Sequence, residues 1–214
     1  MRHFATAPSP FIDMADQGAA FRLRSAILML GNQCADAEES VEMFDEEQQL
    51  LRSEPKDMPS VFKRARRGQM HARSLVFAVD NFIKMIEAMI KDQAAPAAAL
   101  RTTLDSFIAA VPGATALRNS LHHIEDRARR IGSGGRTIAQ TGGAPAGFSV
   151  PPGTQVMFIG SNISNDVIFC TAGNGQTVEL EVSDNTVRLM AQTLQEVVDA
   201  FKWKSPSTPL RIPS

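Results

Sequence analysis

The sequence has few of the residues that mark several common classes of protein. Tyrosine is absent and there is one tryptophan, so aromatic platforms for stacking nucleic-acid bases are scarce. There are two cysteines, Cys34 and Cys170, and both lie in apolar stretches outside any CxxC pattern. No run of about 18 apolar residues occurs, and the first residues lack the apolar core of a signal peptide. We therefore expect a soluble cytoplasmic protein with no membrane span and two reduced, buried thiols.

The net charge of −1 conceals an uneven distribution of charge. Residues 1–62 carry 5 Lys and Arg against 11 Asp and Glu, whereas residues 63–135 carry 12 against 6. One interpretation is that acidic and basic helices lie side by side and attract each other. The other interpretation is that the basic half faces an anionic partner.

Hydrophobic periodicity predicts four helices in the first part of the chain. The first carries an apolar stripe at spacings of three and four residues, formed by Ala20, Leu23, Ile27, Leu30, Cys34, Ala37, Val41 and Phe44. The second is basic at its start, apolar after residue 75, and has Ser60 as its expected N-cap. The predicted helices span residues 15–51, 60–92, 96–110 and 114–131.

The pattern changes after a glycine-rich segment over residues 132–147, which is predicted to be a linker. Short β-branched and aromatic runs predict strands over residues 148–150, 155–159, 166–171 and 177–182. Asn174-Gly175 predicts a hairpin turn between the last two strands. A final amphipathic helix is predicted from Asp184 to about Trp203, where it gives way to a tail rich in Pro and Ser.

Together these elements predict an α+β fold that is mostly α. A helical bundle is expected over residues 15–131, after an N-terminal arm of residues 1–14. A small antiparallel sheet and a C-terminal helix are expected over residues 148–203, and residues 204–214 are expected to form a disordered tail.

One cluster carries a combination of side chains that suits phosphate chemistry. Arg118, Asn119, His122 and His123 lie in a predicted helix, within the sequence LRNSLHHIEDR. An arginine offers a forked positive charge to a phosphate, and a histidine titrates near neutral pH. Such a pair suits RNA cleavage, in which a histidine takes the 2′-hydroxyl proton and an arginine stabilises the charged phosphate.

The Arg-Asn-x3-His pattern and the order of the helices resemble HEPN domains, and in particular uncharacterised bacterial HEPN-like proteins. The resemblance covers residues 15–131 and implies a bundle of four to five helices that forms homodimers. Arg118, Asn119 and His123 match the family's motif positions, while His122 has no assigned role. Many members are metal-independent ribonucleases of toxin or defence systems, and others act only as binding modules.

Two hypotheses about function therefore remain open. The first is a dimeric interaction module that binds a protein or RNA partner, in which Arg118 pairs with the acidic residues 42–47. The second is a metal-independent endoribonuclease that uses Arg118 and His123. Either hypothesis requires no cofactor, and adjacent histidines on a helix are poorly placed to chelate one metal ion, so no metal site is expected.

A basic run near the start of the second predicted helix is a candidate binding surface. It consists of Lys63, Arg64, Arg66, Arg67 and Arg73. This run is either the solvated end of a helix or a surface for RNA or an acidic protein.

Overall fold

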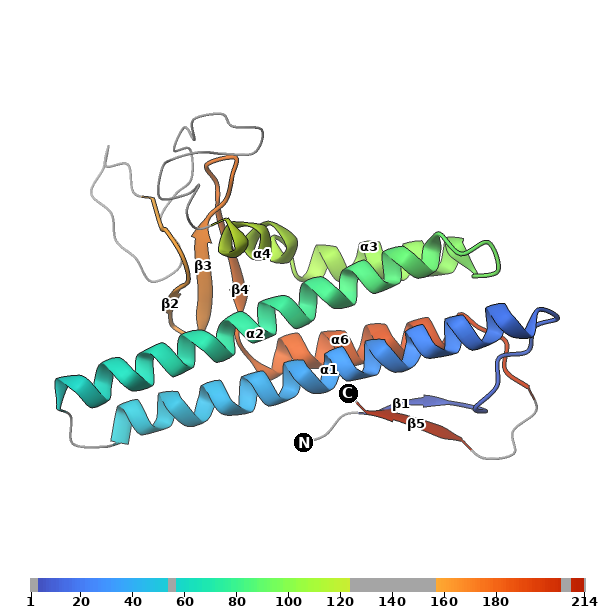
Figure 1. Ribbon diagram of the computed structural model, residues 1–214, viewed down its shortest axis with the longest axis horizontal. Helices are drawn as coiled ribbons and strands as arrows, with labels where there is room; N and C mark the ends of the chain where they lie inside the picture. The colour runs from blue at the N-terminus through green and yellow to red at the C-terminus, as the bar shows by residue number, and fades with distance from the viewer. Residues whose placement is uncertain (1–3, 54–56, 124–156, 205–208, 214) are drawn as a thin grey trace. The chain divides into compact units, whose positions relative to one another are not determined.

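The computed structural model describes residues 4–53, 57–123, 157–204 and 209–213, and Figure 1 shows its elements in chain order. The helices are α1 (Gln17–Ser53), α2 (Met58–Ile90), α3 (Ala97–Ala110), α4 (Ala114–His122) and α6 (Asp184–Asp199). The strands are β1 (Phe4–Ala7), β2 (Asn162–Ser164), β3 (Val167–Thr171), β4 (Thr177–Glu181) and β5 (Leu210–Pro213). The predicted fold class, α+β and mostly α, is confirmed. No helix of the described ranges has the length and apolar character needed to cross a membrane.

The chain forms two compact units, and each is built from separate stretches of sequence. Unit 1 contains residues 1–39, 78–110 and 184–214, and unit 2 contains residues 40–77 and 111–183. Helices α1 and α2 therefore contribute residues to both units. The units interleave along the chain, whereas the sequence predicts a bundle followed by a sheet.

Unit 1 packs its helices around an apolar core and carries a two-stranded ribbon. Strand β1 pairs antiparallel with β5, and helix α6 contacts both α3 and β1. Figure 1 shows this ribbon beside α6 and the first part of α1. The core side chains, each at most 2% exposed, include Leu23, Ile27, Leu30, Phe82, Ile86, Leu100, Leu104, Phe107, Met190, Leu194 and Val197.

Strand β5 lies where the composition predicts a disordered tail, so that prediction is wrong for Leu210–Pro213. In the ribbon, Ala5 stands opposite Ile212, and both side chains are buried. The pairing supplies backbone hydrogen bonds and apolar burial that no local signal in a Pro- and Ser-rich tail reveals. The N-terminal arm likewise contributes β1.

Unit 2 combines the rest of α1 and α2 with α4 and a three-stranded sheet. The sheet is antiparallel with the order β2-β3-β4, and α4 contacts β3 and β4. Its fully or almost fully buried side chains include Val41, Phe44, Leu75, Val76, Leu117, Ile168, Phe169 and Leu180. The sheet and α4 thus cover an apolar core that the two long helices share.

The hairpin between β3 and β4 uses the predicted turn. The N–H of Gly175 donates to the carbonyl of Ala172 at 3.0 Å, and Gly175 has a φ of 85°. Strand β2, by contrast, is not predicted from the sequence. It joins β3 through Asn165 and Asp166, whose φ values of 49° and 61° fit a two-residue type I′ turn.

Two other predicted strands are not found among the described residues. Residues 157–159, the described part of the strand predicted over 155–159, form no regular strand. Phe158 instead exchanges hydrogen bonds with Thr171, one of them to its side-chain hydroxyl. The predicted strand over residues 148–150 and the predicted linker over 132–147 lie outside the described residues.

The helices follow their predicted stripes, and their ends differ from prediction by a few residues. Every member of the predicted α1 stripe is buried. Helix α2 begins at Met58 because Asp57, and not Ser60, is its cap: Asp57 Oδ1 accepts a hydrogen bond from the Ser60 N–H at 2.8 Å. This bond and one from the Ser60 hydroxyl lower the pKa of the Asp57 carboxyl below its usual value.

Candidate functional site

The Arg-Asn-x3-His motif lies on the short helix α4 of unit 2. Gly113 precedes the helix in the left-handed conformation with a φ of 87°, and the helix ends where the His123 N–H donates to the Asn119 carbonyl. Arg118 is half-buried, whereas Asn119, His122 and His123 are exposed. The helix was predicted to extend to residue 131, but residues 124–131 lie outside the described part of the chain.

Arg118 and His122 meet at the ring of Phe77, which belongs to α2. The Arg118 guanidinium carbon lies 6.0 Å from the centroid of the phenyl ring, and the His122 ring packs edge-on with centroids 5.4 Å apart. Arg118 Nη1 also donates to Asn119 Oδ1 at 3.2 Å. Since residues four apart share a helix face, Arg118 and His122 reach the same ring, while His123 projects in a different direction.

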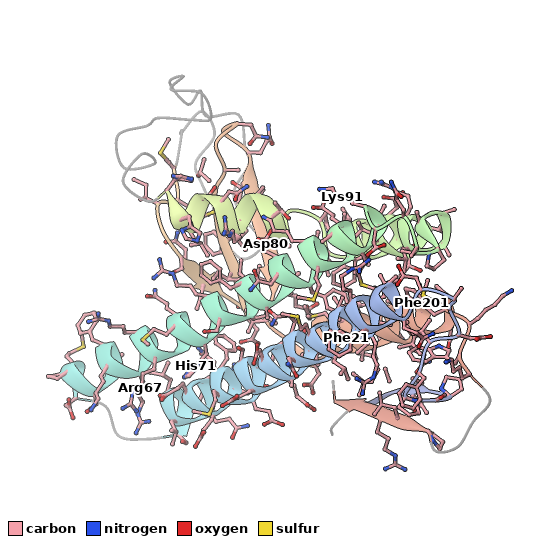
Figure 2. The ribbon with its side chains drawn as sticks, turned by 45° about the vertical axis from the view of Figure 1, so that its right-hand side comes forward. Phe21, Arg67, His71, Asp80, Lys91 and Phe201 are labelled. Atoms are coloured by element: carbon pink, nitrogen blue, oxygen red, sulfur yellow. The ribbon has the colours of Figure 1, made fainter. Side chains whose placement is uncertain are left out.

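The acidic and basic helices are joined by ion pairs at one buried carboxylate. Glu47 of α1, whose side chain is 7% exposed, lies 3.5 Å from Arg64 and 3.4 Å from Arg67. Figure 2 shows Arg67 on the part of α2 that lies against α1. Glu47, one of the acidic residues predicted to pair with Arg118, therefore pairs with the basic run instead. This supports the interpretation in which oppositely charged helices lie side by side.

The remaining cations of the basic run have no such partner. Among the described residues, Lys63, Arg66 and Arg73 make no side-chain ion pair or hydrogen bond. The structure thus divides the predicted basic run into Arg64 and Arg67, which are paired, and three cations that are available to a ligand.

Two of the available cations, Arg66 and Arg73, lie on a face of α2 that also presents large apolar side chains. We call this face the α2 outer stripe and define it as Phe62, Arg66, Met70, Arg73 and Phe77. Steps of three or four residues place these five side chains on one side of the helix. Phe62 is 67% exposed and Met70 is 57% exposed. The outer stripe is therefore basic and apolar, and Arg118 and His122 contact its last residue.

Sequence reasoning missed Phe77, Phe62 and Met70. The helical spacing does place each of these residues on the face of α2 opposite the predicted core. Gly68, for comparison, faces inward: a methyl group at its Cα would lie 3.7 Å from the ring of Phe44. Sequence patterns do not show which outward-facing apolar side chains of a helix make contacts and which stay exposed. For this reason the sequence does not distinguish Phe62, Met70 and Phe77 from other surface residues.

No metal site emerges from the described residues, since no group of three His, Cys, Asp or Glu side chains lies close enough to hold an ion there.

The polar hollow between α1, α2 and the β2–β3 turn has a volume of about 390 Å³ and contains the ion pair between Arg52 and Asp166 at 3.8 Å. Both partners of that pair are well exposed, so it stabilises the unit little.

Both cysteines are buried and no disulfide joins them, as the sequence predicts. Cys34 has no exposed surface, and burial together with the nearby Glu38 carboxylate raises the pKa of its thiol far above the usual value. The unfolded chain therefore ionises first as the pH rises past about 8.5, and the contribution of Cys34 to stability declines in alkaline solution.

We expect both thiols of the folded protein to resist a water-soluble disulfide reagent at pH 8, because only an exposed thiolate reacts rapidly. In the presence of denaturant, two thiols per chain should react within the mixing time. Absorbance of the released thiolate measures both rates. Rapid reaction of either thiol without denaturant would contradict the burial of Cys34 and Cys170.

Comparisons of the whole chain with models of protein families, with curated proteins and with solved structures found no match.

Proposed function

We propose that this chain is a HEPN-like, dimeric interaction module that binds an anionic protein or RNA partner through the α2 outer stripe and Lys63. The observation that carries the proposal is the exposure of Phe62 and Met70 among three cations that lack a partner in the described residues. Large apolar side chains and arginines are the residues enriched at the centres of protein interfaces. On RNA, the same arginines would contact phosphates and the ring of Phe62 would stack on a base.

The Arg118 cluster supports the same proposal. A planar guanidinium can stack on an aromatic ring and can also offer a forked set of donors to a phosphate or carboxylate. Phe77 and Asn119 contact Arg118, and His122 packs edge-on against the same ring. In this proposal the motif residues extend the outer stripe at its C-terminal end and take part in binding.

We expect the triple replacement Lys63→Gln, Arg66→Gln and Arg73→Gln to weaken binding of a fluorescein-labelled 20-nucleotide single-stranded RNA by about 30-fold at 50 mM salt. Three lost phosphate contacts should also reduce the slope of log affinity against log salt by about 2. Fluorescence anisotropy at 50 and 200 mM salt measures both quantities. Labelled polyglutamate, titrated in parallel, reports an acidic protein partner.

A matched triple variant controls for net charge. Lys91, Arg101 and Lys202 are exposed cations of unit 1, and their replacement by glutamine removes the same charge without touching the outer stripe. This variant should bind within about threefold of the unchanged protein, since distant charges are screened. The proposal fails if neither probe binds, or if both triple variants bind equally well.

Homodimer formation rests on the HEPN resemblance of the sequence. Sedimentation equilibrium at micromolar concentration measures it directly. A mass near twice the 23.2 kDa of the chain would support the dimer, and a single-chain mass at all concentrations would oppose it.

A second candidate function is the metal-independent endoribonuclease that uses Arg118 and His123. The exposure of both His122 and His123 beside Arg118 favours it, because a general base must reach the substrate. If it is correct, RNA is cleaved in EDTA, and His123→Ala abolishes cleavage without unfolding the protein. His71→Ala, a histidine of α2 outside the motif and labelled in Figure 2, should keep full activity. Absence of cleavage by the unchanged protein would exclude this candidate.

A further inference from the structure

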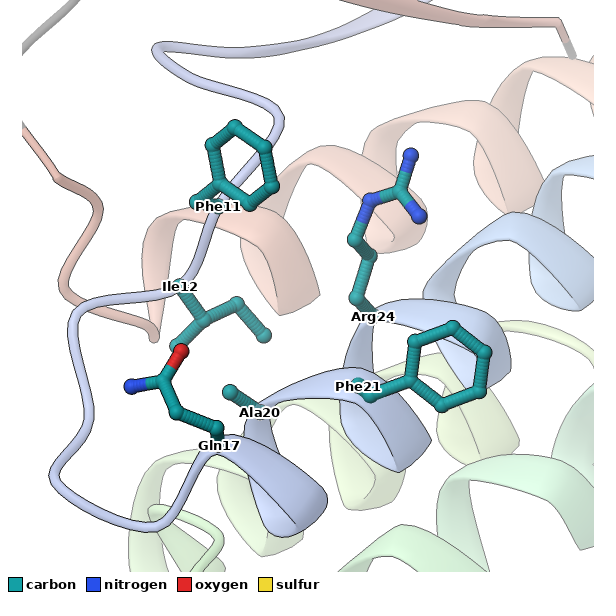
Figure 3. Close-up of a pocket in the computed structure, with 6 residues that line it drawn as sticks. All are labelled: Phe11, Ile12, Gln17, Ala20, Phe21 and Arg24. Carbon is teal, nitrogen blue, oxygen red and sulfur yellow. The ribbon is translucent and has the colours of Figure 1, made fainter.

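Unit 1 contains a small pocket that the proposed function does not use. It lies between the segment that precedes α1 and the first turns of α1, and its volume is about 180 Å³. Its walls, drawn in Figure 3, are formed by Phe11, Ile12, Gln17, Ala20, Phe21 and Arg24. The floor is apolar, because Ile12 and Ala20 are buried.

The walls of this pocket are held by hydrogen bonds of the backbone and of one side chain. The N–H of Lys204 donates to the carbonyl of Phe11 at 3.0 Å, and Ile12 forms an isolated β-bridge with Trp203. On the other side, Asp16 Oδ1 accepts hydrogen bonds at the first turn of α1, from the N–H groups of residues 18 and 19. The pocket is thus formed before any ligand arrives.

Two phenyl rings at the rim of the pocket are unusually open to solvent. Phe11 is 60% exposed and Phe21 is 67% exposed. Leaving two large aromatic side chains exposed at the rim of one pocket forfeits burial that a folded protein normally obtains. A ligand that covers both rings would recover it.

Arg24 gives the pocket a polar specificity. Figure 3 shows its side chain rising from α1 near both rings. Its Nε is buried and has no hydrogen-bond partner among the described residues. The neighbouring Arg22 differs, since it pairs with Asp92 at 3.4 Å. A buried charged donor without an acceptor is unfavourable, and a carboxylate that reaches Arg24 from the pocket would satisfy it.

We propose that this pocket binds a peptide segment of a partner protein in which a carboxylate lies next to a large apolar side chain. The carboxylate accepts hydrogen bonds from the Arg24 guanidinium, and the apolar side chain fills the space between Phe11 and Phe21. A peptide fits better than a free metabolite, because the cavity is below the roughly 300 Å³ of typical small-molecule sites and matches a single anchoring side chain. This site lies in unit 1 and is independent of the α2 outer stripe.

The test uses acetyl-glycyl-phenylalanine, which carries a free carboxylate beside its aromatic ring, and the same peptide with a C-terminal amide. NMR follows the Nε–H signal of Arg24, which the Arg24→Met variant identifies by its absence. We expect a saturable shift of this signal with the acid, at millimolar concentrations, and about tenfold weaker binding of the amide, because the charge-assisted hydrogen bonds are lost.

Three variants complete the test. Arg24→Met and Phe21→Ala should each weaken binding of the acid at least fivefold, measured on the peptide signals, while thermal unfolding shows that each variant is still folded. Arg22→Met removes the same charge two residues earlier in the sequence. This variant should bind the acid within twofold of the unchanged protein. Equal binding of acid and amide, equal binding by Arg24→Met, or no saturable binding would each overturn the proposal.

Discussion

We expect replacement of Glu47 by alanine to lower the free energy of unfolding by about 3 kcal/mol, the scale at which removal of one partner destabilises a buried ion pair. Glu47 is the buried carboxylate that both Arg64 and Arg67 approach. Its loss removes a carboxylate that lies 3.5 Å from Arg64, whose side chain is only 24% exposed. The methylene groups of Glu47 are lost from the interface of α1 and α2 at the same time.

Chemical denaturation followed by circular dichroism measures this change. Glu46→Ala is the matched control, because Glu46 precedes Glu47 on the same helix and is exposed. It should alter stability by less than about 0.5 kcal/mol. The Glu47 variant should also bind polyanions more tightly under conditions in which it stays folded, since a negative charge beside the basic run has been removed. Equal stability of the Glu46 and Glu47 variants would contradict the assigned ion pairs.

We expect Gly113→Val to destabilise the protein by about 3 kcal/mol, for two reasons that add. Gly113 has a φ of 87°, which a β-branched residue adopts only with considerable strain. A Cβ atom at this position would also lie 3.3 Å from Cβ of Val178 in β4, so the methyl groups of valine would displace the strand. Because Gly113 starts α4, the displacement would carry Arg118 and His122 away from Phe77.

Gly68→Ala provides the opposite case within the same unit. Gly68 lies in the interior of α2, and a Cβ there would lie 3.3 Å from Nε2 of Gln48, the movable end of a flexible side chain. We expect this variant to be stabilised by up to about 1 kcal/mol, since alanine favours the helix over glycine. Thermal unfolding of both variants measures the difference. A Gly113→Val variant as stable as Gly68→Ala would show that α4 is not held as described.

The long helices could be predicted from sequence because their signal is local and repeated. The apolar stripe of α1 recurs from Ala20 to Phe44, and every member is buried. The start of α2 was misplaced because Asp57 and Ser60 are both good caps, and only the geometry shows which oxygen accepts the hydrogen bond. Strand β5 was missed because its partner β1 lies about 200 residues away, and no local pattern encodes that pairing.

The candidate site was predicted in part. The sequence singled out Arg118 and the basic run, because their residue types carry recognisable chemistry. It did not reveal that Glu47 pairs with Arg64 and Arg67, or that Phe77 connects α4 to α2. Both facts depend on which side chains from different helices come into contact. Helix periodicity shows on which face of its own helix a residue lies, but it does not show which residue of another helix it contacts.

Hydrogen exchange with and without a bound polyanion is the most direct test of a binding surface on the α2 outer stripe. Mass spectrometry of the chain with the 20-nucleotide RNA or with polyglutamate should show slowed exchange in peptides covering residues 58–77 and 114–123. Peptides covering the ribbon of β1 and β5 should exchange as before. Protection confined to unit 1, or no protection at saturating ligand, would contradict a binding surface on the α2 outer stripe.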